Sequence, residues 1–443
     1  CTSLYTALFL PLTPTTRLNL HHFLEMCILG YQCRNCEQNI LFELFFRIVY
    51  MKKILVLNSG SSSLKYQLFN VDGDKYEVVA KGNAERIGIY GSFVSIKIGD
   101  GDKIIKDVAL PSHNEAIKEV LNLLLNGALK SLDELDGVGH RVVQGGSFFD
   151  KSVLITDEVL KKIDELSILA PLHNPAAVLG IKAVKNALPN IKQVAAFDTA
   201  FHQSMPKEAY LYPLPIEQYE AHQIRRYGAH GTSHQYVARR AAELLGCDGK
   251  FITCHLGNGA SISAVDHGKC RDTSMGFTPL AGIMMGTRCG DIDPYIPLHI
   301  MKYQRKTVDE VNDLLNKQSG MLGLSGFSDN RDVEAKYLAG DEKAKTAMEV
   351  YVHTIIRFIG SYIAVLGGVD AIIFTAGIGE NSPLLRKMLC ERLSYLGIKL
   401  VDEANNKRGE EIEISTPDSK VKVFVIPTNE ELVIAQDTVE LTK

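Results

Sequence analysis

The chain has 443 residues, of which 46% are hydrophobic and 23% charged, and its formal net charge at pH 7 is -4. This length exceeds the ~100–200 residues of one typical domain, so we expect two sizeable cores. The slightly acidic balance lacks the basic excess of a nucleic-acid binder, which argues against a nucleic-acid partner. Any anionic ligand must therefore be held by a few local groups.

The first fifty residues differ from the rest of the chain. They hold four of the nine cysteines, including Cys33 and Cys36, and cluster apolar side chains without a helical or strand period. No basic region precedes their apolar stretch, and no run reaches the ~18 apolar residues of a membrane span. Met51 and the two lysines after it read as a start, so we expect 1–50 to be a non-native or disordered extension. The scattered cysteines favour reduced thiols in the cytoplasm, without a membrane partner.

From residue 51 onward, strand patterns alternate with helical patterns, which predicts an α/β fold. The strand-prone run 54–57 leads into a Gly-Ser turn at 60–63 and a second alternating strand. One Ser-rich hairpin would be ordinary, but the arrangement recurs at 251–265 around a Gly-x-Gly turn. Such turns can hold phosphate groups with exposed backbone N–H groups. The repetition predicts two related half-domains that close on one nucleotide.

Further elements follow in chain order. Apolar residues spaced three to four apart predict helices at 114–126, 156–168, 233–246, 307–317, 341–366 and 382–396. Buried-strand patterns predict strands at 193–197, 251–254, 371–374 and 421–426. Thr156 and Ser382 are good helix caps. We expect the chain to cross between lobes near residues 200 and 428.

Three charged residues stand out as candidates for the ligand site. Arg141 and Arg288 lie beside small residues, and a guanidinium is a planar fork that matches carboxylate and phosphate oxygens. Ordinary surface ion pairs are the alternative for either one. Asp198 ends a predicted strand, where ligands of α/β sheets bind, although a carboxylate there can also cap a helix.

Five histidines lie in four short motifs, at His173, His202, His230 with His234, and His255. A zinc site is one interpretation, but no HExxH helix or closely spaced third ligand accompanies them. Phosphoryl transfer depends on positioning and charge stabilisation, so His230 is a candidate donor to phosphoryl oxygens. His202 and His234 fit core or capping roles better.

The C-terminal part adds two candidate ligand sites. A strand runs directly into Gly377-x-Gly379 and a helix, which would let the backbone approach an adenosine and its α-phosphate. The third glycine of the dinucleotide fingerprint is absent. Glu430 and Glu431 follow the last strand, as acidic metal anchors or as first-turn helix charges.

Nine stretches in order carry a resemblance to one family: LNSGSSSLKY, GHRVV with GG, APLHNP, FDTAFHQ, YGAHGTSH, TCHLGNGASI, MGTRCGDIDP, FTAGIGEN and IPTNEEL. Together they resemble the acetokinase family of the actin, Hsp70 and sugar kinase superfold, over essentially all of 51–443. The resemblance implies two duplicated ribonuclease H-like (actin-type) lobes around a nucleotide cleft. It divides the chain into an N-terminal lobe, 51–200 plus 428–443, and a C-terminal nucleotide-binding lobe, 201–427.

The resemblance also implies a reaction and its residues. The reaction is reversible phosphorylation of acetate to acetyl phosphate by direct in-line transfer from ATP, which leaves ADP, in a homodimer. Mg²⁺, with Mn²⁺ as an alternative, would be held by Asn58 and Glu430. Arg141 would bind the carboxylate, Asp198 would be the acid/base residue or orient the carboxylate, and His230 with Arg288 would stabilise the transition state. The acyl pocket would be lined by Val143, Leu172, Ala229 and Pro279. The nucleotide would be bound by Lys65, His255, Leu256, Gly257, Asn258, Gly259, Asp329, Asn330, Arg331, Gly377, Ile378, Gly379, Glu380 and Asn381.

The sequence departs from the family pattern at Gln144, at Ala281 and in a shortened loop at 325–331, which bears on the nucleotide contacts. Two alternatives stay open. A propionate or butyrate kinase would share every phosphate motif and differ only in the acyl pocket, where one methylene is worth ~1–3 kcal/mol. An actin- or Hsp70-like ATPase that serves as an assembly module would reuse the hairpins but needs a further polypeptide-binding surface.

Overall fold

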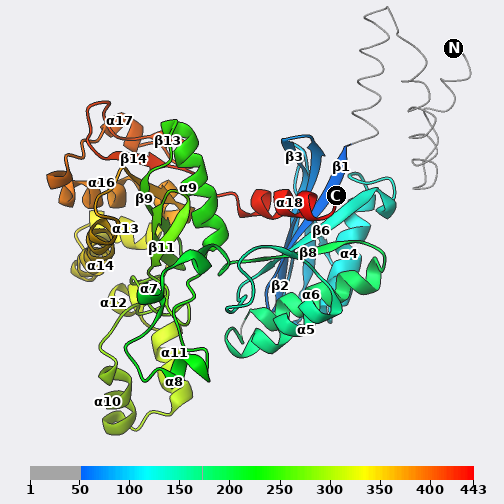
Figure 1. Ribbon diagram of the computed structural model, residues 1–443. Coiled ribbons are helices and arrows are strands. Elements are labelled where there is room, and N and C mark those ends of the chain that lie inside the picture. Colours follow the sequence, from blue (N-terminus) through cyan, green and yellow to red (C-terminus); the bar gives the residue numbers. More distant parts are fainter. Residues whose placement is uncertain (1–50, 172) are drawn as a thin grey trace, which may run out of the picture.

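The computed structural model describes residues 51–171 and 173–443, which form two lobes, each built on one mixed sheet (Figure 1). The expectation for residues 1–50 therefore lies outside the described part of the chain. In the first lobe the strand order is β5-β4-β3-β2-β1-β6-β8-β7, and in the second it is β11-β10-β9-β12-β14-β13.

The first sheet consists of β1 (Lys52–Ser59), β2 (Ser63–Asp72), β3 (Lys75–Glu85), β4 (Phe93–Ile98), β5 (Ile104–Asp107), β6 (Leu135–Val142), β7 (Val153–Leu154) and β8 (Gln193–Phe197). Its helices are α4 (His113–Leu125), α5 (Asp157–Glu165), α6 (Asn174–Ala187) and, from the end of the chain, α18 (Glu430–Leu441). Helices α4 and α6 pack together and cover one face, over a core that includes Leu55, Leu57 and Val120.

The second sheet consists of β9 (Lys250–Leu256), β10 (Ala260–Asp266), β11 (Lys269–Thr273), β12 (Ala371–Thr375), β13 (Ile412–Glu413) and β14 (Lys422–Val425). Its helices are α7 (Lys207–Tyr210), α8 (Glu217–Glu220), α9 (Gly231–Leu245), α10 (Tyr295–Gln304), α11 (Val308–Lys317), α12 (Gly320–Ser325), α13 (Asn330–Leu338), α14 (Glu342–Leu366), α15 (Ala376–Asn381), α16 (Pro383–Arg392) and α17 (Asp402–Asn405).

The two sheets share one plan. In each, three antiparallel strands (β1-β2-β3 and β9-β10-β11) are followed by two strands parallel to the first, β6 and β8 or β12 and β14. Both predicted hairpins are present, with turns at 60–62 and 257–259. The prediction of an α/β fold with two duplicated lobes is therefore confirmed.

Most predicted elements lie within a few residues of their expected positions. Thr156 and Ser382 cap α5 and α16, because their side-chain oxygens accept hydrogen bonds from the backbone N–H groups of Val159 and Leu385. Two predicted helices were too long, since α5 and α16 pass into 3-10 turns at Leu166–Ile168 and Ser394–Leu396.

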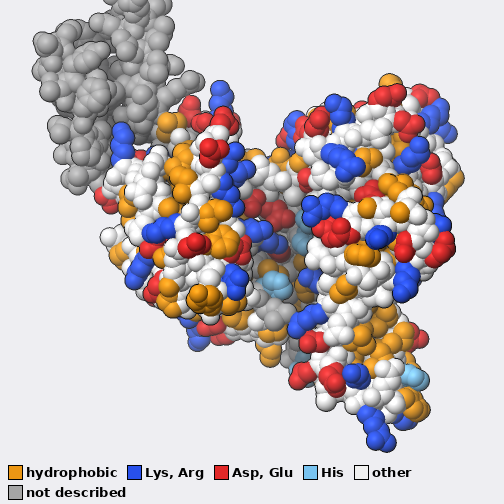
Figure 2. Space-filling model, turned by 180° about the vertical axis from the view of Figure 1, so that it is seen from behind, with side chains coloured by type: hydrophobic (Ala, Val, Ile, Leu, Met, Phe, Trp, Pro, Cys, Tyr) orange, Lys and Arg blue, Asp and Glu red, His pale blue; other side chains and the backbone are white. Residues whose placement is uncertain are grey.

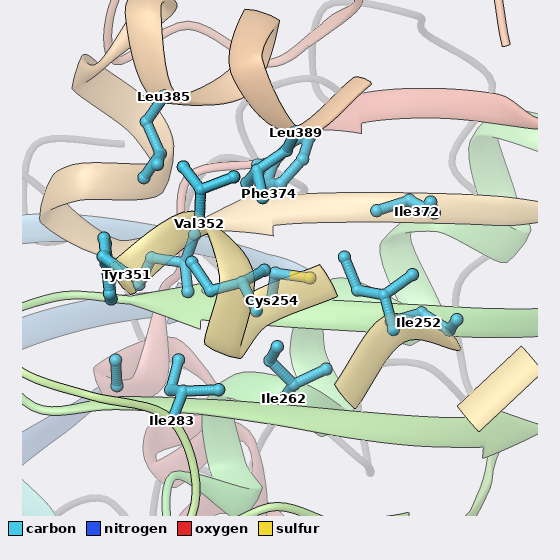
Figure 3. Close-up of a cluster of buried hydrophobic side chains, with 14 of the residues drawn as sticks. Ile252, Cys254, Ile262, Ile283, Tyr351, Val352, Ile372, Phe374, Leu385 and Leu389 are labelled. Atoms are coloured by element: carbon cyan, nitrogen blue, oxygen red, sulfur yellow. The ribbon is translucent and has the colours of Figure 1, made fainter. Parts of the chain in front are cut away.

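Helix α14 forms the centre of the second core. Its side chains Tyr351 and Val352 meet Ile252 and Cys254 of β9 and Phe374 of β12 (Figure 3). At 25 residues it is long and apolar enough to cross a membrane by length and composition alone. In the fold, however, α14 packs against β9, β10, α12, α13 and α16.

Helix α18 returns the chain to the first lobe, where it lies beside β1, β6 and β8 (red in Figure 1). Ile434 and Ala435 pack against Ile54 and Val56. A Cβ at Gly139 of β6 would lie 2.5 Å from Thr438 Oγ1, so the close approach of helix and strand requires a glycine there. The first turn of α18 is thereby held at the end of β6.

Candidate active site

A hollow separates the two lobes, and histidine and charged side chains are visible in it (Figure 2). On the first lobe, Arg141 at the end of β6 donates from Nε and Nη2 to the two carboxylate oxygens of Asp198, at 3.0 and 2.7 Å. Asp198 follows β8, the strand beside β6, and its side chain is 2% exposed. Because both oxygens are engaged, this bidentate pair fixes the plane of the guanidinium. Nη1 of Arg141 donates to none of the described residues, so that edge is available to an anion.

Glu430 approaches the same guanidinium, with Oε2 3.7 Å from Nε of Arg141. Burial raises the pKa of Glu430 to about 7, and the charges of Asp198 and Glu431 add to the effect of burial against the opposing charges of Arg141 and Lys65. Burial disfavours the charged form of Arg141, but Asp198 and Glu430 outweigh it and raise the arginine pKa. The carboxylates here are thus only partly balanced by protein cations.

Asn58 and Lys65 lie at the neighbouring edge of the sheet. They are cross-strand partners in β1 and β2, and together with Glu431 they line a hollow of ≈ 310 Å³. The electrostatic coupling of Lys65 to Glu430 places that carboxyl nearby. The structure therefore brings Asn58, Lys65 and Glu430 to one region, although they come from opposite ends of the chain.

On the second lobe, three imidazoles and two serine hydroxyls form a buried cluster. Ser261 Oγ lies 2.9 Å from Nδ1 of His230 and 2.8 Å from Nε2 of His234. The rings of His230 and His255 stack with centroids 4.1 Å apart. Nδ1 of His255 contacts Ser233 Oγ, at 2.8 Å. Burial lowers the pKa values of these three histidines, helped at His230 and His234 by their histidine neighbours, so the rings are neutral at pH 7.

His230 holds an unusual backbone position at the start of α9. Its φ is +58°, in the left-handed region, and it directly precedes the helix. The next residue, Gly231, donates its N–H to the carbonyl of Asp198 at 2.8 Å, and a Cβ there would lie 2.2 Å from that oxygen. The start of α9 is therefore pressed against Asp198, which joins the imidazole cluster to the carboxylate of the first lobe.

Arg288 meets His230 at the tip of the second hairpin. A Cβ at Gly259 would lie 3.5 Å from Arg288 Nη1 and 3.8 Å from His230 Nε2. Arg288 donates from Nη1 to the carbonyl of Pro279, at 3.2 Å, and burial lowers its pKa. None of the described carboxylates pairs with Arg288. Two guanidinium groups thus face the region between the lobes, one fixed by Asp198 and one without a counter-charge.

Of the expected acyl-pocket residues, Val143 follows β6 two residues after Arg141, and Pro279 contacts Arg288. Ala229 is buried beside His230 and accepts a hydrogen bond from His202 through its carbonyl. Leu172 lies outside the described residues.

A second hollow, of ≈ 710 Å³, holds most of the residues predicted to bind nucleotide. They come from the β9–β10 turn, the start of α13 and α15. Its lining includes Gly257, Asn258, Asp329, Asn330, Arg331, Gly377, Ile378 and Asn381. The shortened loop still brings Asp329, Asn330 and Arg331 to this hollow, because Asp329 caps α13. Lys65 is not among the lining residues and lies on the other lobe.

Sequence reasoning missed several residues of this hollow. Ser328, Glu334, Ser382 and Arg408 also line it. Asn330 donates to Glu334, while its buried Oδ1 has no protein partner and can accept from a ligand. Arg386 is fully buried and donates from Nη1 to the carbonyls of Gly379 and Glu380, at 2.8 and 2.9 Å. The sequence held one signal for the role of Arg386, since it is a charged residue among the apolar positions of α16.

The donor set of the first lobe fits a hard divalent cation. The described part of the chain contains no group of three or more His, Cys, Asp or Glu arranged to hold a metal. Mg²⁺ needs fewer protein ligands, since it keeps several waters and binds through one or two carboxylates and phosphate oxygens. Asn58 offers an amide oxygen, and Glu430 is a buried carboxyl whose pKa is raised chiefly by that burial. The imidazoles of the second lobe hydrogen-bond to hydroxyl groups, so they are not the candidate metal ligands.

The repeated sheet plan, with hollows at the ends of the strands and between the lobes, defines a two-lobed α/β protein of the ribonuclease H-like class. A family model described as the Acetokinase family matches residues 53–436. The chain belongs to that family. The acetate kinase of Thermotoga maritima is 56% identical over 401 residues, spanning 88% of this chain and 99% of that protein. That of Halothermothrix orenii is 55% identical over 398 residues, spanning 88% and 100%.

Two solved structures extend the comparison. An acetate kinase from Porphyromonas gingivalis has a TM-score of 0.85 at 45% identity, covering 88% of this chain and 100% of that one. A propionate kinase from Francisella tularensis has a TM-score of 0.83 at 43% identity, with coverage of 88% and 100%. The fold alone therefore does not separate the two acyl substrates.

Proposed function

We propose that this chain is an acetate kinase that reversibly transfers the γ-phosphoryl group of ATP to acetate. The observation that carries this proposal is the pair of guanidinium groups facing the region between the lobes. Arg141, with its plane fixed by Asp198, offers a free edge suited to a carboxylate. Arg288, with no counter-charge, suits the oxygens of a transferring phosphoryl group.

In the forward reaction, an acetate oxygen forms a bond to the γ-phosphorus while the bond from that phosphorus to the β–γ bridging oxygen breaks. The products are acetyl phosphate and ADP. Acetate is already ionised at neutral pH, so no strong base is required. Asp198 then serves to orient Arg141 and the bound carboxylate, because its two oxygens are committed to the guanidinium.

The imidazole cluster supports a donor role for His230. A neutral imidazole has one N–H, and the Ser261 hydroxyl can donate to only one of its two histidine neighbours. If Ser261 donates to Nδ1 of His230, then Nε2 of His234 donates to Ser261, and Thr253 donates to Nδ1 of His234. In that set the Thr253 hydroxyl gives up its long contact of 3.5 Å with the Ser263 carbonyl, and an N–H remains at Nε2 of His230, the ring nitrogen that faces Gly259.

The metal and the nucleotide complete the proposed site. Asn58 and Glu430 would hold Mg²⁺, or Mn²⁺ in its place, and the bound ion would neutralise charge on the phosphate oxygens. The ≈ 710 Å³ hollow would take ATP, with the 257–259 turn and α15 approaching its phosphates and 329–331 approaching its base. Lys65 and Glu380 would act from the edges of this site.

The test is a coupled hydroxamate assay with ATP and each of acetate, propionate and butyrate. We expect the highest kcat/KM with acetate and a partial loss with propionate, since one methylene is worth ~1–3 kcal/mol. A higher kcat/KM for propionate would make the chain a propionate kinase, as the relation to the Francisella tularensis enzyme allows. ATP hydrolysis without any acyl phosphate would favour an ATPase module instead.

The proposal also includes the domain boundaries. We assign 51–200 with 428–443 to one domain and 201–427 to the other, supported by the packing of α18 on the first sheet.

The proposed location is the cytoplasm. It is supported by the described cysteines, Cys247, Cys254, Cys270, Cys289 and Cys390, which are all free thiols.

A homodimer is supported by the exposed apolar surface of α10. This helix has no buried residue, and Tyr295, Leu298 and Tyr303 are 56%, 56% and 62% exposed. Large exposed apolar patches mark interaction sites. Light scattering should show a dimer for the intact chain and a monomer for Leu298→Glu with Tyr303→Glu, and a monomeric parent would refute the assignment.

A further inference from the structure

One face of the first sheet is left open beyond α18. The helix packs on β1, β6 and β8 and shares a buried cluster with Phe69 and Val71 of β2, whereas Lys81 of β3 is exposed. A line of directly paired residues crosses that open face: Gln67 of β2 pairs with Lys81 of β3, and Lys81 pairs with Lys97 of β4. Lys103, from the turn before β5, lines the same hollow of ≈ 310 Å³. We call Lys81, Lys97 and Lys103 the lysine shelf.

The lysine shelf is not charge-balanced by the protein. Among the described residues, none of the three lysines makes an ion pair or a side-chain hydrogen bond. Like charges directly opposite each other on neighbouring strands destabilise a sheet. Lys81 and Lys97 are such a pair. Among the described residues, the single carboxylate that lines the hollow is that of Glu431, on the first turn of α18.

Neutral hydrogen-bonding groups lie among the cations. Gln67 and Asn83 also line the hollow, and both are half-buried. Asn83 is fixed by Glu85, which accepts from its Nδ2 at 2.7 Å. The hollow therefore combines three unpaired ammonium groups with amide groups, on the rigid surface of a sheet. This combination suits a ligand with several adjacent anionic oxygens.

The shelf is separate from the nucleotide hollow. That hollow is lined by second-lobe residues, and the two share no lining residue. Lys65 and Asn58 form the border between the shelf and the proposed Mg²⁺ site. A ligand on the shelf would lie beside the catalytic region without occupying the place of acetate or the adenine ring.

We propose that the lysine shelf is a second anion site, which binds a linear polyphosphate group. Strands lie ~4.8 Å apart, so lysines on β3, β4 and the following turn can meet successive phosphates of one chain. Lysine is suited to this task because a compact ammonium on a flexible stem can follow a bending phosphate chain. The group could be inorganic or the tail of a second nucleotide, since both present the same oxygens.

The test titrates inorganic tripolyphosphate into the full chain, with ADP at saturation and no divalent metal, by calorimetry. We expect one bound equivalent, and at least ~10-fold weaker binding in Lys81→Gln with Lys97→Gln, because two of three charge-assisted contacts are lost. The matched control is Lys118→Gln with Lys161→Gln, which removes the same charge from exposed helix positions of the same lobe. It should bind as the parent does.

Thermal unfolding with turnover, and a titration with ATP, are two further tests of the proposal. Tripolyphosphate should raise the Tm of the parent and the control but not of the shelf variant, whose acetate kinase turnover should stay within ~2-fold of the parent. An ATP titration without ADP separates the sources: two equivalents indicate that a nucleotide tail is accepted, and one indicates an inorganic chain. Equal affinity in the shelf variant and the parent, or loss of tripolyphosphate binding on saturation with ADP, would overturn the proposal.

Discussion

The two lobes have the same sheet plan and use it for different chemistry. In the first, the strands beside the hairpin end in charged groups, Arg141 and Asp198, with Glu430 brought to them by α18. In the second, the edge at which β9 ends carries neutral imidazoles, from β9 and the start of α9, held by serine and threonine hydroxyls. The backbone thus fixes where functional groups gather, and the side chains decide whether that edge offers charge or neutral donors.

This contrast has a physical consequence for each site. The charged groups of the first lobe depend on one another, since removal of one partner leaves a buried charge uncompensated. The imidazoles of the second lobe remain neutral because burial opposes their protonation. Changes in the first lobe should therefore alter both chemistry and stability, whereas changes at Arg288 should alter chemistry alone.

The largest effect is expected for Arg141→Ala. The substitution removes the proposed carboxylate clamp, so turnover should fall by at least ~100-fold. It also leaves the buried carboxylate of Asp198 without its partner, which typically costs ~3–5 kcal/mol of stability. Steady-state kinetics and urea unfolding measure the two effects. Arg141→Lys should rescue little, because an ammonium cannot reproduce the bidentate fork.

A double variant separates the two effects of that change. Arg141→Ala with Asp198→Asn removes the uncompensated charge, so stability should recover in part while turnover stays low. Recovery of turnover together with stability would mean that Arg141 is structural.

Arg288→Ala tests the other side of the contrast. Turnover should also fall by at least ~100-fold, because a charge-assisted donor to the transferring phosphoryl group is lost. Among the described residues, its side chain donates hydrogen bonds to the Pro279 carbonyl and the sulfur of Met285 and makes no ion pair, so the free energy of unfolding should change little. Near-normal turnover would refute the assigned role.

Glu430→Ala should have a smaller effect on turnover and a specific effect on metal dependence. If Glu430 holds Mg²⁺, the variant needs a higher Mg²⁺ concentration for half-maximal rate, by about tenfold or more, with reduced turnover. If Glu430 only favours the N-terminus of α18, its loss costs ~0.3–1 kcal/mol of stability. Unchanged metal dependence with lower stability would support that second role. Glu431→Ala, one position along the same helix, is the matched control.

Sequence reasoning succeeded where the information is local. Hairpins, caps and buried strands depend on short patterns, so the residues within each contiguous motif were assigned to the correct strand, turn or helix. The contacts between motifs could not be predicted in this way. Arg141 and Asp198 are 57 positions apart, and their pairing follows from the register of β6 against β8.

The groups that hold the site were also beyond the sequence patterns. Ser261 of β10 joins His230 and His234 only because the start of α9 packs against the sheet, and Thr428 reaches Ser233 across 195 residues. Lys81 and Lys97 look like ordinary exposed strand lysines until their pairing is known. Side-chain chemistry could be read from the sequence, but side-chain neighbours depended on tertiary structure.

The smallest expected effect concerns pH and compares the buried histidines of the two lobes. Burial lowers the pKa of His140 in the first lobe to about 4, as it does for His202 and His255 in the second. Because the folded pKa lies below the unfolded value of ~6.5, the unfolded chain takes up protons first. The stability that these neutral histidines contribute is therefore complete above pH ~6.5 and is lost as the pH falls toward 4, which gives the free energy of unfolding a slope with pH.

His140→Gln, which keeps a donor for the Gln193 side chain, should reduce that slope by up to ~1.4 kcal/mol per pH unit. Denaturant unfolding at several pH values between 7.5 and 5 measures the slope, and exposed His222→Gln is the control that should leave it unchanged. Most of the slope should remain in His140→Gln, because the second lobe holds more of the buried neutral imidazoles. An unchanged slope in that variant would mean that His140 is protonated equally in the folded and unfolded chains.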